Sequence, residues 1–349
     1  PTTHNNFNRI FELGLVFADD LPLSISRNKI MQDTGIIRII RRFVVRAMIR
    51  LLTEIMESKS GDDYLLYMTY ASNIKRGVIS EVGPNQEQLK NLLRFSSNRT
   101  GFDPFDMTSL AAYVERMKER QREIYYLVGE STEAVKKSPF LERMAMEGYE
   151  VLLLTEAIDD TLVDEGLKDY EGFKLVDISK YSENMLFGES TIEEKKEGEA
   201  GYEGWIVPLL RLLHKILEKE VSRVVRSNRL VKSPCAVSTE KDSMSANHER
   251  ILRAYPLKDV TCAFAMNPVA KVLEVNTGHP IITKLGRLLE DEERRQDREE
   301  IISRVAWLLY YSALPSSGFI VHDPHPFIED VHSILSLSLG QHSGFLFCK

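Results

Sequence analysis

Two short apolar runs, Ile124–Val128 and Glu150–Leu154, constrain the fold of this chain more than any other feature. Both are predicted to be strands, and the residues between them carry helical patterns, the second opened by Pro139 and closed by Gly148. A strand–helix–strand unit of this length forms a parallel pair with a right-handed crossover. The sequence therefore predicts an α/β fold. No glycine-rich phosphate loop follows either strand, so the unit is interpreted as architecture and interaction surface.

Long helices are predicted on both sides of this unit. Apolar residues recur at three- and four-residue steps in Ile36–Met56, Met107–Glu123, Trp205–Glu220, Arg298–Leu314 and Phe327–Leu339. In the first helix the apolar stripe comprises Ile36, Ile40, Phe43, Ala47, Leu51 and Ile55. Arginines cover the rest of its surface, and two interpretations stay open. They form either a basic face for phosphate or an acidic partner, or a solvated flank beside acidic neighbours.

Composition argues against several classes of protein. The net charge of -7 opposes a dedicated nucleic-acid binder, although the arginine-rich helix alone would permit one. No apolar run approaches the roughly 20 residues that cross a bilayer, so no membrane insertion is predicted. Cys235, Cys262 and Cys348 form no CxxC pair, and the histidines lack the spacing of metal ligands. The sequence thus predicts neither a metal site nor a disulfide framework.

The segment ADDLPLSISR, residues 18–27, is the strongest candidate for a functional loop. Pro22 fixes its own φ and biases the preceding residue towards extended geometry, which predicts an ordered loop. Arg27 at its end would present a planar guanidinium, which binds phosphate oxygens bidentately. The other interpretation pairs Arg27 with Asp19 or Asp20 in an ordinary connection.

This loop resembles that of the heat shock protein 90 chaperones, and further blocks resemble the same family in order and spacing from about Phe11 to Gly340. These blocks are Asn73–Ile79, Leu92–Phe95, Tyr113–Met117, Ile124–Leu127, Ser138–Arg143, Gly148–Leu152, Ser245–Asn247 and Ser317–Phe319. The resemblance implies the middle and C-terminal portion of an ATP-dependent chaperone. ATP with Mg would be bound by an N-terminal domain that precedes this portion in the family, and ATP hydrolysis is expected only together with that domain.

The resemblance also assigns roles to individual residues. Arg27 is the expected catalytic arginine that reaches the γ-phosphate, and Gln32 is the expected glutamine beside it. The run between them is one residue longer than in the family, which favours a rival interpretation. In that rival the chain is a divergent scaffold that binds clients and dimerises without productive hydrolysis. A shift of about 1 Å at such a site can lower the rate about a hundredfold.

Two further sites follow from the resemblance. The stretch 257–269 corresponds to a client-contacting segment, in which Val260, Phe264 and Met266 supply apolar surface. A helix packed in the core is the equally weighted alternative. The last two helices either complete a core, as periodicity favours, or form a homodimer interface, as the resemblance implies. The expected interface residues are Ile302, Val305, Leu309, Val331 and Leu335. Partners would be a second copy, unfolded or partly folded clients and co-chaperones.

The expected organisation is an α/β middle-domain portion with a helical connector, followed by a mixed α/β C-terminal dimerisation domain that ends in helices. Its parts are the end of the first middle-domain lobe (1–60), a helical connector (61–105), a small α/β lobe (106–181), a hinge (182–203), the dimerisation domain (204–340) and a tail (341–349). The blocks Tyr113–Lys118 and Asn228–Cys235 look closest to endoplasmin, and the sequon Asn98-Arg99-Thr100 agrees with its endoplasmic-reticulum lumen. A cytoplasmic location is the alternative.

Overall fold

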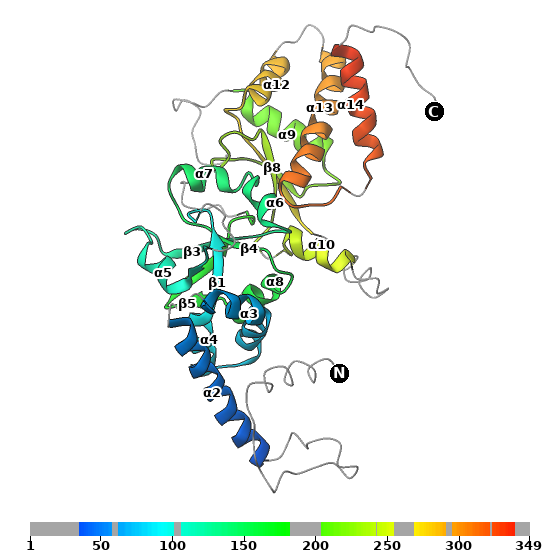
Figure 1. The fold of residues 1–349 in the computed structure, drawn as a ribbon. Coiled ribbons are helices and arrows are strands. Elements are labelled where there is room, and N and C mark those ends of the chain that lie inside the picture. Colours follow the sequence, from blue (N-terminus) through cyan, green and yellow to red (C-terminus); the bar gives the residue numbers. More distant parts are fainter. Residues whose placement is uncertain are drawn as a thin grey trace, which may run out of the picture. The chain divides into compact units, whose positions relative to one another are not determined.

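A computed structural model describes residues 35–57, 62–100, 106–181, 204–241, 243–254, 269–290, 295–321 and 323–338 (Figure 1). The described chain divides into two compact units, each taken by itself below. The first unit falls within 1–95, 104–116 and 161–174, and the second within 96–103, 117–160 and 175–349. The expected catalytic residues Arg27 and Gln32, the expected client residues Val260, Phe264 and Met266, the hinge and the tail lie outside the described residues.

Helices dominate the first unit. They are α2 (Gly35–Glu57), α3 (Asp62–Ser80), α4 (Pro84–Leu92) and α5 (Leu110–Glu115), with the π-helix η2 (Leu162–Gly166) packed on α3. The break between α3 and α4 falls at Gly83–Pro84, where Gly83 adopts a φ of 69° and Pro84 opens α4. A Cβ at Gly166 would lie 3.0 Å from the carbonyl oxygen of Val78, so the close approach of η2 to α3 requires glycine.

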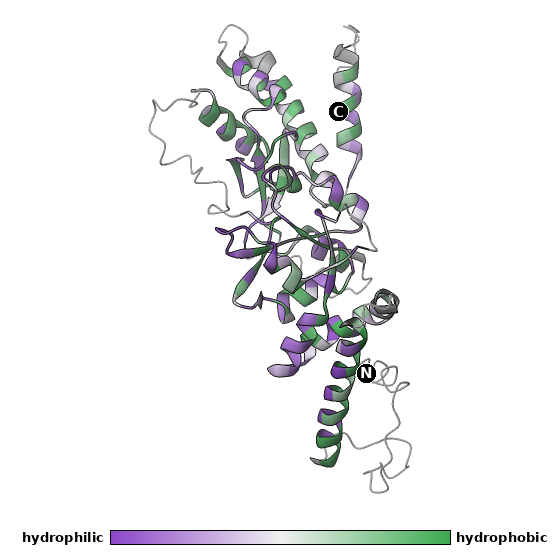
Figure 2. Ribbon diagram, turned by 60° about the vertical axis from the view of Figure 1, so that its left-hand side comes forward, coloured by the Kyte–Doolittle hydropathy of each residue, from purple (hydrophilic) through white to green (hydrophobic). Residues whose placement is uncertain are grey.

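The predicted helix Ile36–Met56 is confirmed as α2, but its apolar stripe is not the buried face. Phe43 is 67% exposed and Ile36 is 53% exposed, whereas Ile49 and Met56 are buried. Hydrophobic and hydrophilic residues alternate along this helix (Figure 2). Periodicity correctly grouped the residues of one face, yet it could not tell which face meets the rest of the unit.

Hydrogen bonding orders the strands between residues 94 and 177 as β2-β1-β4-β3-β6-β5. They are β1 (Arg94–Ser97), β2 (Thr108–Ser109), β3 (Glu123–Val128), β4 (Leu152–Leu154), β5 (Asp169–Tyr170) and β6 (Phe173–Asp177). The predicted parallel pair is confirmed: β3 and β4 run parallel, with Tyr126 opposite Leu152. Two short helices, α6 (Thr132–Lys136) and α7 (Leu141–Met146), lie between them in sequence.

The helix predicted over Met107–Glu123 is wrong in its bounds. Thr108 belongs to β2, and the helix α5 covers only Leu110–Glu115. Ser109 caps α5, because its hydroxyl accepts a hydrogen bond from the backbone N–H of Ala112 at 3.1 Å. Beyond the end of α5, the side-chain amide of Gln121 donates a hydrogen bond to the carbonyl of Glu123, where β3 begins.

A second sheet forms in the C-terminal half, with strand order β7-β9-β8. Its strands are β7 (Arg223–Arg226), β8 (Cys235–Thr239) and β9 (Lys271–Val275); β9 is parallel to β7 and antiparallel to β8. The helices of this half are α9 (Ile206–Ile216), α10 (Ala246–Ala254), α12 (Pro280–Glu290), α13 (Arg295–Ser316) and α14 (His325–Ser338). Helix α13 packs on β8, α9 packs beside β7, and α14 lies along α13 (Figure 1).

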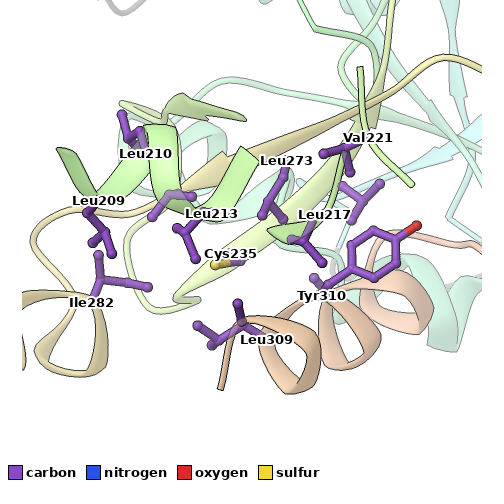
Figure 3. Close-up of a cluster of buried hydrophobic side chains, with 14 of the residues drawn as sticks. Leu209, Leu210, Leu213, Leu217, Val221, Cys235, Leu273, Ile282, Leu309 and Tyr310 are labelled. Carbon is purple, nitrogen blue, oxygen red and sulfur yellow. The ribbon is translucent and has the colours of Figure 1, made fainter. Parts of the chain in front are cut away.

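One large hydrophobic core holds the C-terminal half together (Figure 3). Leu209 and Leu213 of α9 are buried: Leu209 lies beside Ile282 of α12, and Leu213 lies in the same cluster as Leu273 of the sheet and Leu309 of α13. Fully burying one such leucine stabilises the fold by about 1.5–3 kcal/mol. The core therefore ties α9, α12, α13 and the β7-β9-β8 sheet into one body.

Candidate functional site

The structure separates the expected interface residues into two groups. Ile302 and Leu309 are buried in the core of their own chain, at 0% and 7% exposure, and Val305 packs against that core. Val331 is partly buried, whereas Leu335 on α14 is 51% exposed. Ile302 and Leu309 therefore have the packing expected of core residues, and the apolar surface on α13 and α14 consists of other residues, among them Ile301, Ile328 and Leu335.

Within the second unit, polar side chains join the α/β segments 117–160 and 175–181 to the C-terminal half, and we call this set of contacts the junction. Its members are Glu142, Asp160, Arg229, Ser233, Ser245, Asn247 and Glu274. Most of them are buried, and their partners lie far apart in sequence. The junction is our candidate functional site, because buried polar and charged side chains meet there across long sequence distances.

At the centre of the junction, Arg229 forms a buried ion pair with Glu274 of β9. The Nε of Arg229 donates to Oε2 of Glu274 at 2.8 Å, and Nη2 donates to Oε1, which makes the pair bidentate. Nη1 donates to the carbonyl oxygen of Ile178, and the guanidinium lies 4.5 Å from the ring centre of Phe140. Buried charges are tolerated when every lone pair and proton finds a partner. Arg229 thus connects β9 with residues on both sides of the junction.

A second contact fixes the start of α10. Ser245 Oγ donates to Asp160 Oδ1 at 2.8 Å, and the amide of Asn247 donates to the other carboxylate oxygen. The same serine hydroxyl accepts the backbone N–H of His248 at 3.0 Å, so Ser245 caps the helix. The block Ser245–Asn247, which contributes to the family resemblance, thus lies at the start of α10. Burial raises the pKa of the neighbouring Asp177 above its ordinary value, and Asp160 adds to the rise.

The third contact, which we call the Glu142 clasp, consists of one carboxylate of α7 and three consecutive residues of a loop. The backbone N–H groups of Val231 and Lys232 each donate to Oε2 at 2.7 Å. Ser233 donates its N–H at 3.1 Å and its Oγ at 2.5 Å to Oε1. Burial alone would raise the pKa of Glu142, but the hydrogen bonds from Ser233, Val231 and Lys232 outweigh it and lower the pKa below 4.5.

The polar and charged groups of the junction make structural contacts within the second unit. Within the described ranges, no group of three or more His, Cys, Asp or Glu side chains is arranged to hold a metal ion. No described helix is long and apolar enough to span a membrane. Burial raises the pKa of Cys235 to about 12, so its thiol stays protonated and unreactive at neutral pH. Each charged group of the junction is held by an opposite charge or by neutral hydrogen-bond donors of the other half.

The sequon serves a structural purpose in this fold. The side-chain amide of Asn98 donates to the carbonyl of Tyr149 at 3.0 Å, and its oxygen accepts the N–H of Val151 at 2.9 Å. Asn98 thereby continues the pairing of β1 with β4 beyond the last residue of β1. Asn98 thus has a structural role at the end of β1.

Sequence reasoning did not single out the three contacts of the junction. Glu142 and Arg229 lie inside blocks that carried the family resemblance, and this was the only available signal. Their partners are 91 and 45 residues away, and no periodic pattern connects positions at such distances. Which groups lie opposite these charges is a property of the folded chain.

The described chain is an α/β protein with two sheets. Buried polar contacts join the two halves of its second unit. The chain belongs to the Hsp90 protein family, whose model matches residues 10–344. It is 34% identical over 331 residues to "Heat shock protein 90-5, chloroplastic" of Arabidopsis thaliana, which covers 95% of this chain. The chain spans 40% of the length of that relative. The relative's name refers to the chloroplast, so this comparison does not support the expected likeness to endoplasmin.

Proposed function

We propose that this chain is part of an ATP-dependent molecular chaperone that binds and remodels client proteins as a homodimer. The observation that carries the proposal is the family match over residues 10–344, which includes the Arg27 loop, both described sheets and the terminal helices. The junction agrees with this function. A machine that changes the shape of a client needs rigid parts joined by defined contacts, and buried hydrogen-bonded pairs supply such contacts.

In this proposal ATP and Mg are bound elsewhere in the longer protein, and Arg27 meets the γ-phosphate when the nucleotide-binding part closes. A fixed guanidinium stabilises the charge on the phosphoryl group that is transferred. Gln32 supplies a neutral hydrogen bond, which contributes less. Val260, Phe264 and Met266 would contact the client, and the apolar surface of α13 and α14 would meet the second copy.

Steady-state ATP turnover in the full-length protein, measured beside nucleotide affinity, tests the catalytic assignment. Arg27→Ala should lower turnover by up to about 10³-fold with little change in affinity, because the ground-state site lies in another domain. Arg27→Lys should rescue poorly, since an ammonium group cannot form the bidentate fork. Gln32→Ala should have a smaller effect. Arg42, an exposed arginine of α2, is the matched control, and its alanine variant should turn over ATP like the parent.

The rival proposal is a scaffold of the same family that binds clients and dimerises without hydrolysis. The extra residue between Arg27 and Gln32 favours it, because the longer run would displace one of the two side chains. Parent-like turnover in Arg27→Ala would replace the catalytic proposal with this one. For the compartment, endoplasmic-reticulum lumen, chloroplast and cytoplasm are distinguished by imaging the tagged full-length protein in its own cell.

A further inference from the structure

The second unit contains the triplet Lys-Ser-Pro twice, as Lys137-Ser138-Pro139 and as Lys232-Ser233-Pro234. A serine followed directly by proline is the dipeptide that proline-directed protein kinases modify. The two copies differ in their surroundings, because Ser138 is buried whereas Ser233 is partly exposed between an exposed Lys232 and Pro234. We propose that Ser233 is a phosphorylation site for a proline-directed kinase, and that a phosphate on its Oγ opens the Glu142 clasp.

The geometry of the clasp explains why a phosphate would open it. Ser233 Oγ donates a hydrogen bond to Oε1 of Glu142 at 2.5 Å, and a phosphate ester on this oxygen removes the donor. It also brings a charge of about −1.5 to −2 against a carboxylate. The carboxylate is ionised at neutral pH because its pKa is held below the ordinary value. Two anions at this separation repel each other, so the Glu142 carboxylate moves away from the backbone N–H groups of the loop.

The reaction itself is an ordinary phosphoryl transfer from ATP. A bond forms between the γ-phosphorus and Ser233 Oγ, and the bond from that phosphorus to the bridging oxygen of ADP breaks. The hydroxyl proton passes to the base of the kinase. Because Oγ is engaged with Glu142, transfer requires a transient opening of the clasp, which is the same movement that the phosphate then stabilises.

Opening of the clasp is expected to be local, because the loop has a second support. The side-chain amide of Asn276 donates to the carbonyl oxygens of Val231 and Ser233, at 3.3 and 3.1 Å. Its backbone N–H donates to the carbonyl of Pro234 at 2.9 Å. The loop therefore stays on the C-terminal sheet when Glu142 is displaced, and the change falls on α7 and its contact with the loop. Phosphorylation would thus loosen one of the three contacts of the junction and leave the fold intact.

The first experiment asks whether the site is modified in the folded chain. The 349-residue protein is incubated with a purified proline-directed kinase and MgATP, and the phosphate is located by peptide mass spectrometry. We expect phosphate on Ser233 and none on Ser138, with loss of the modification in Pro234→Ala. An unmodified Ser233 would overturn the proposal. Equal labelling of Ser138 would also overturn it, because that result shows that the kinase reads the unfolded chain.

The second experiment asks whether the phosphate acts through Glu142. Amide hydrogen exchange of residues 231–233 should accelerate about tenfold or more in the phosphorylated chain, since charge-assisted hydrogen bonds are lost. Exchange in β9 should not change. Glu142→Ala should give the same acceleration without phosphate, and phosphorylation of that variant should add little. Unchanged protection in the phosphorylated parent, or a full additional effect in Glu142→Ala, would each contradict the proposal.

Discussion

Helices α2 and α13 carry similar apolar patterns in sequence, yet the structure uses them in opposite ways. In α2 the patterned stripe is exposed, with Phe43 at 67%, and the buried residues belong to a neighbouring face. In α13 the patterned residues Ile302 and Leu309 lie inside the core of the second unit. The comparison teaches that a period identifies residues on one face of a helix, while the surroundings decide whether that face is core or surface.

The largest effect should come from placing a charge on each stripe. Leu309→Asp should destabilise the second unit by about 4 kcal/mol or more, because an unpaired carboxylate would be buried in a hydrophobic core. Phe43→Asp in α2 should change stability by no more than about 0.5 kcal/mol, since this side chain is exposed. Denaturant unfolding of both variants provides the measurement. A folded, stable Leu309→Asp protein would contradict the core assignment and favour an interface.

A smaller effect should come from adding a methyl group to each unit. A Cβ at Gly286 of α12 would overlap the indole ring of Trp205, so Gly286→Ala should cost about 1–3 kcal/mol. Gly35 at the start of α2 has no atom within 4 Å of the same position, and Gly35→Ala should be neutral or slightly stabilising. Thermal unfolding followed by Trp fluorescence distinguishes the two. Equal melting temperatures would show that the α9–α12 contact adapts more easily than the structure indicates.

A still smaller effect is expected from acid at the Glu142 clasp of the second unit. The pKa of Glu142 is lowered below its ordinary value of 4.5 on folding, so its contribution is present above the unfolded pKa. That contribution is lost as the pH falls through the lower folded pKa. Hydrogen exchange of residues 231–233 should therefore lose protection below about pH 4.5 in the parent, relative to Glu142→Gln. Protection in α2 should not follow this titration. An identical pH profile in parent and variant would show that the clasp contributes nothing.

The substitution Leu335→Asp on α14 is expected to have the smallest effect on stability and a clear effect on dimer formation. Leu335 is 51% exposed, so Leu335→Asp should leave the unfolding free energy within about 0.5 kcal/mol of the parent. If α13 and α14 form the proposed interface, the variant should sediment as a monomer under conditions in which the parent is a dimer. Phe43→Asp, with the same charge on an exposed residue of α2, should remain dimeric. A dimeric Leu335→Asp protein would place the interface elsewhere.

Local patterns determined several elements correctly. The apolar runs around Ile124 and Leu152 predicted the parallel strands, and the stripe of Leu209 and Leu213 predicted the buried face of α9. Gly83 and Pro84 mark the break before α4, because glycine permits a positive φ and proline is suited to the first helical position. In each case the physical cause lies within one turn or one strand, so the sequence alone contained it.

Only the tertiary structure decided which face of α2 is buried, that Ile302 and Leu309 belong to the core, and which partners Glu142 and Arg229 have. Burial depends on what the rest of the chain brings against a surface, and a hydrogen bond between residues 45 or 91 positions apart depends on the complete path between them. The sequence by itself determined the elements and, through resemblance, the family. The partners of each charge were decided only when those elements packed against one another. Packing removes water from the charges, and the free energy of the ion pair or the clasp depends on that desolvation.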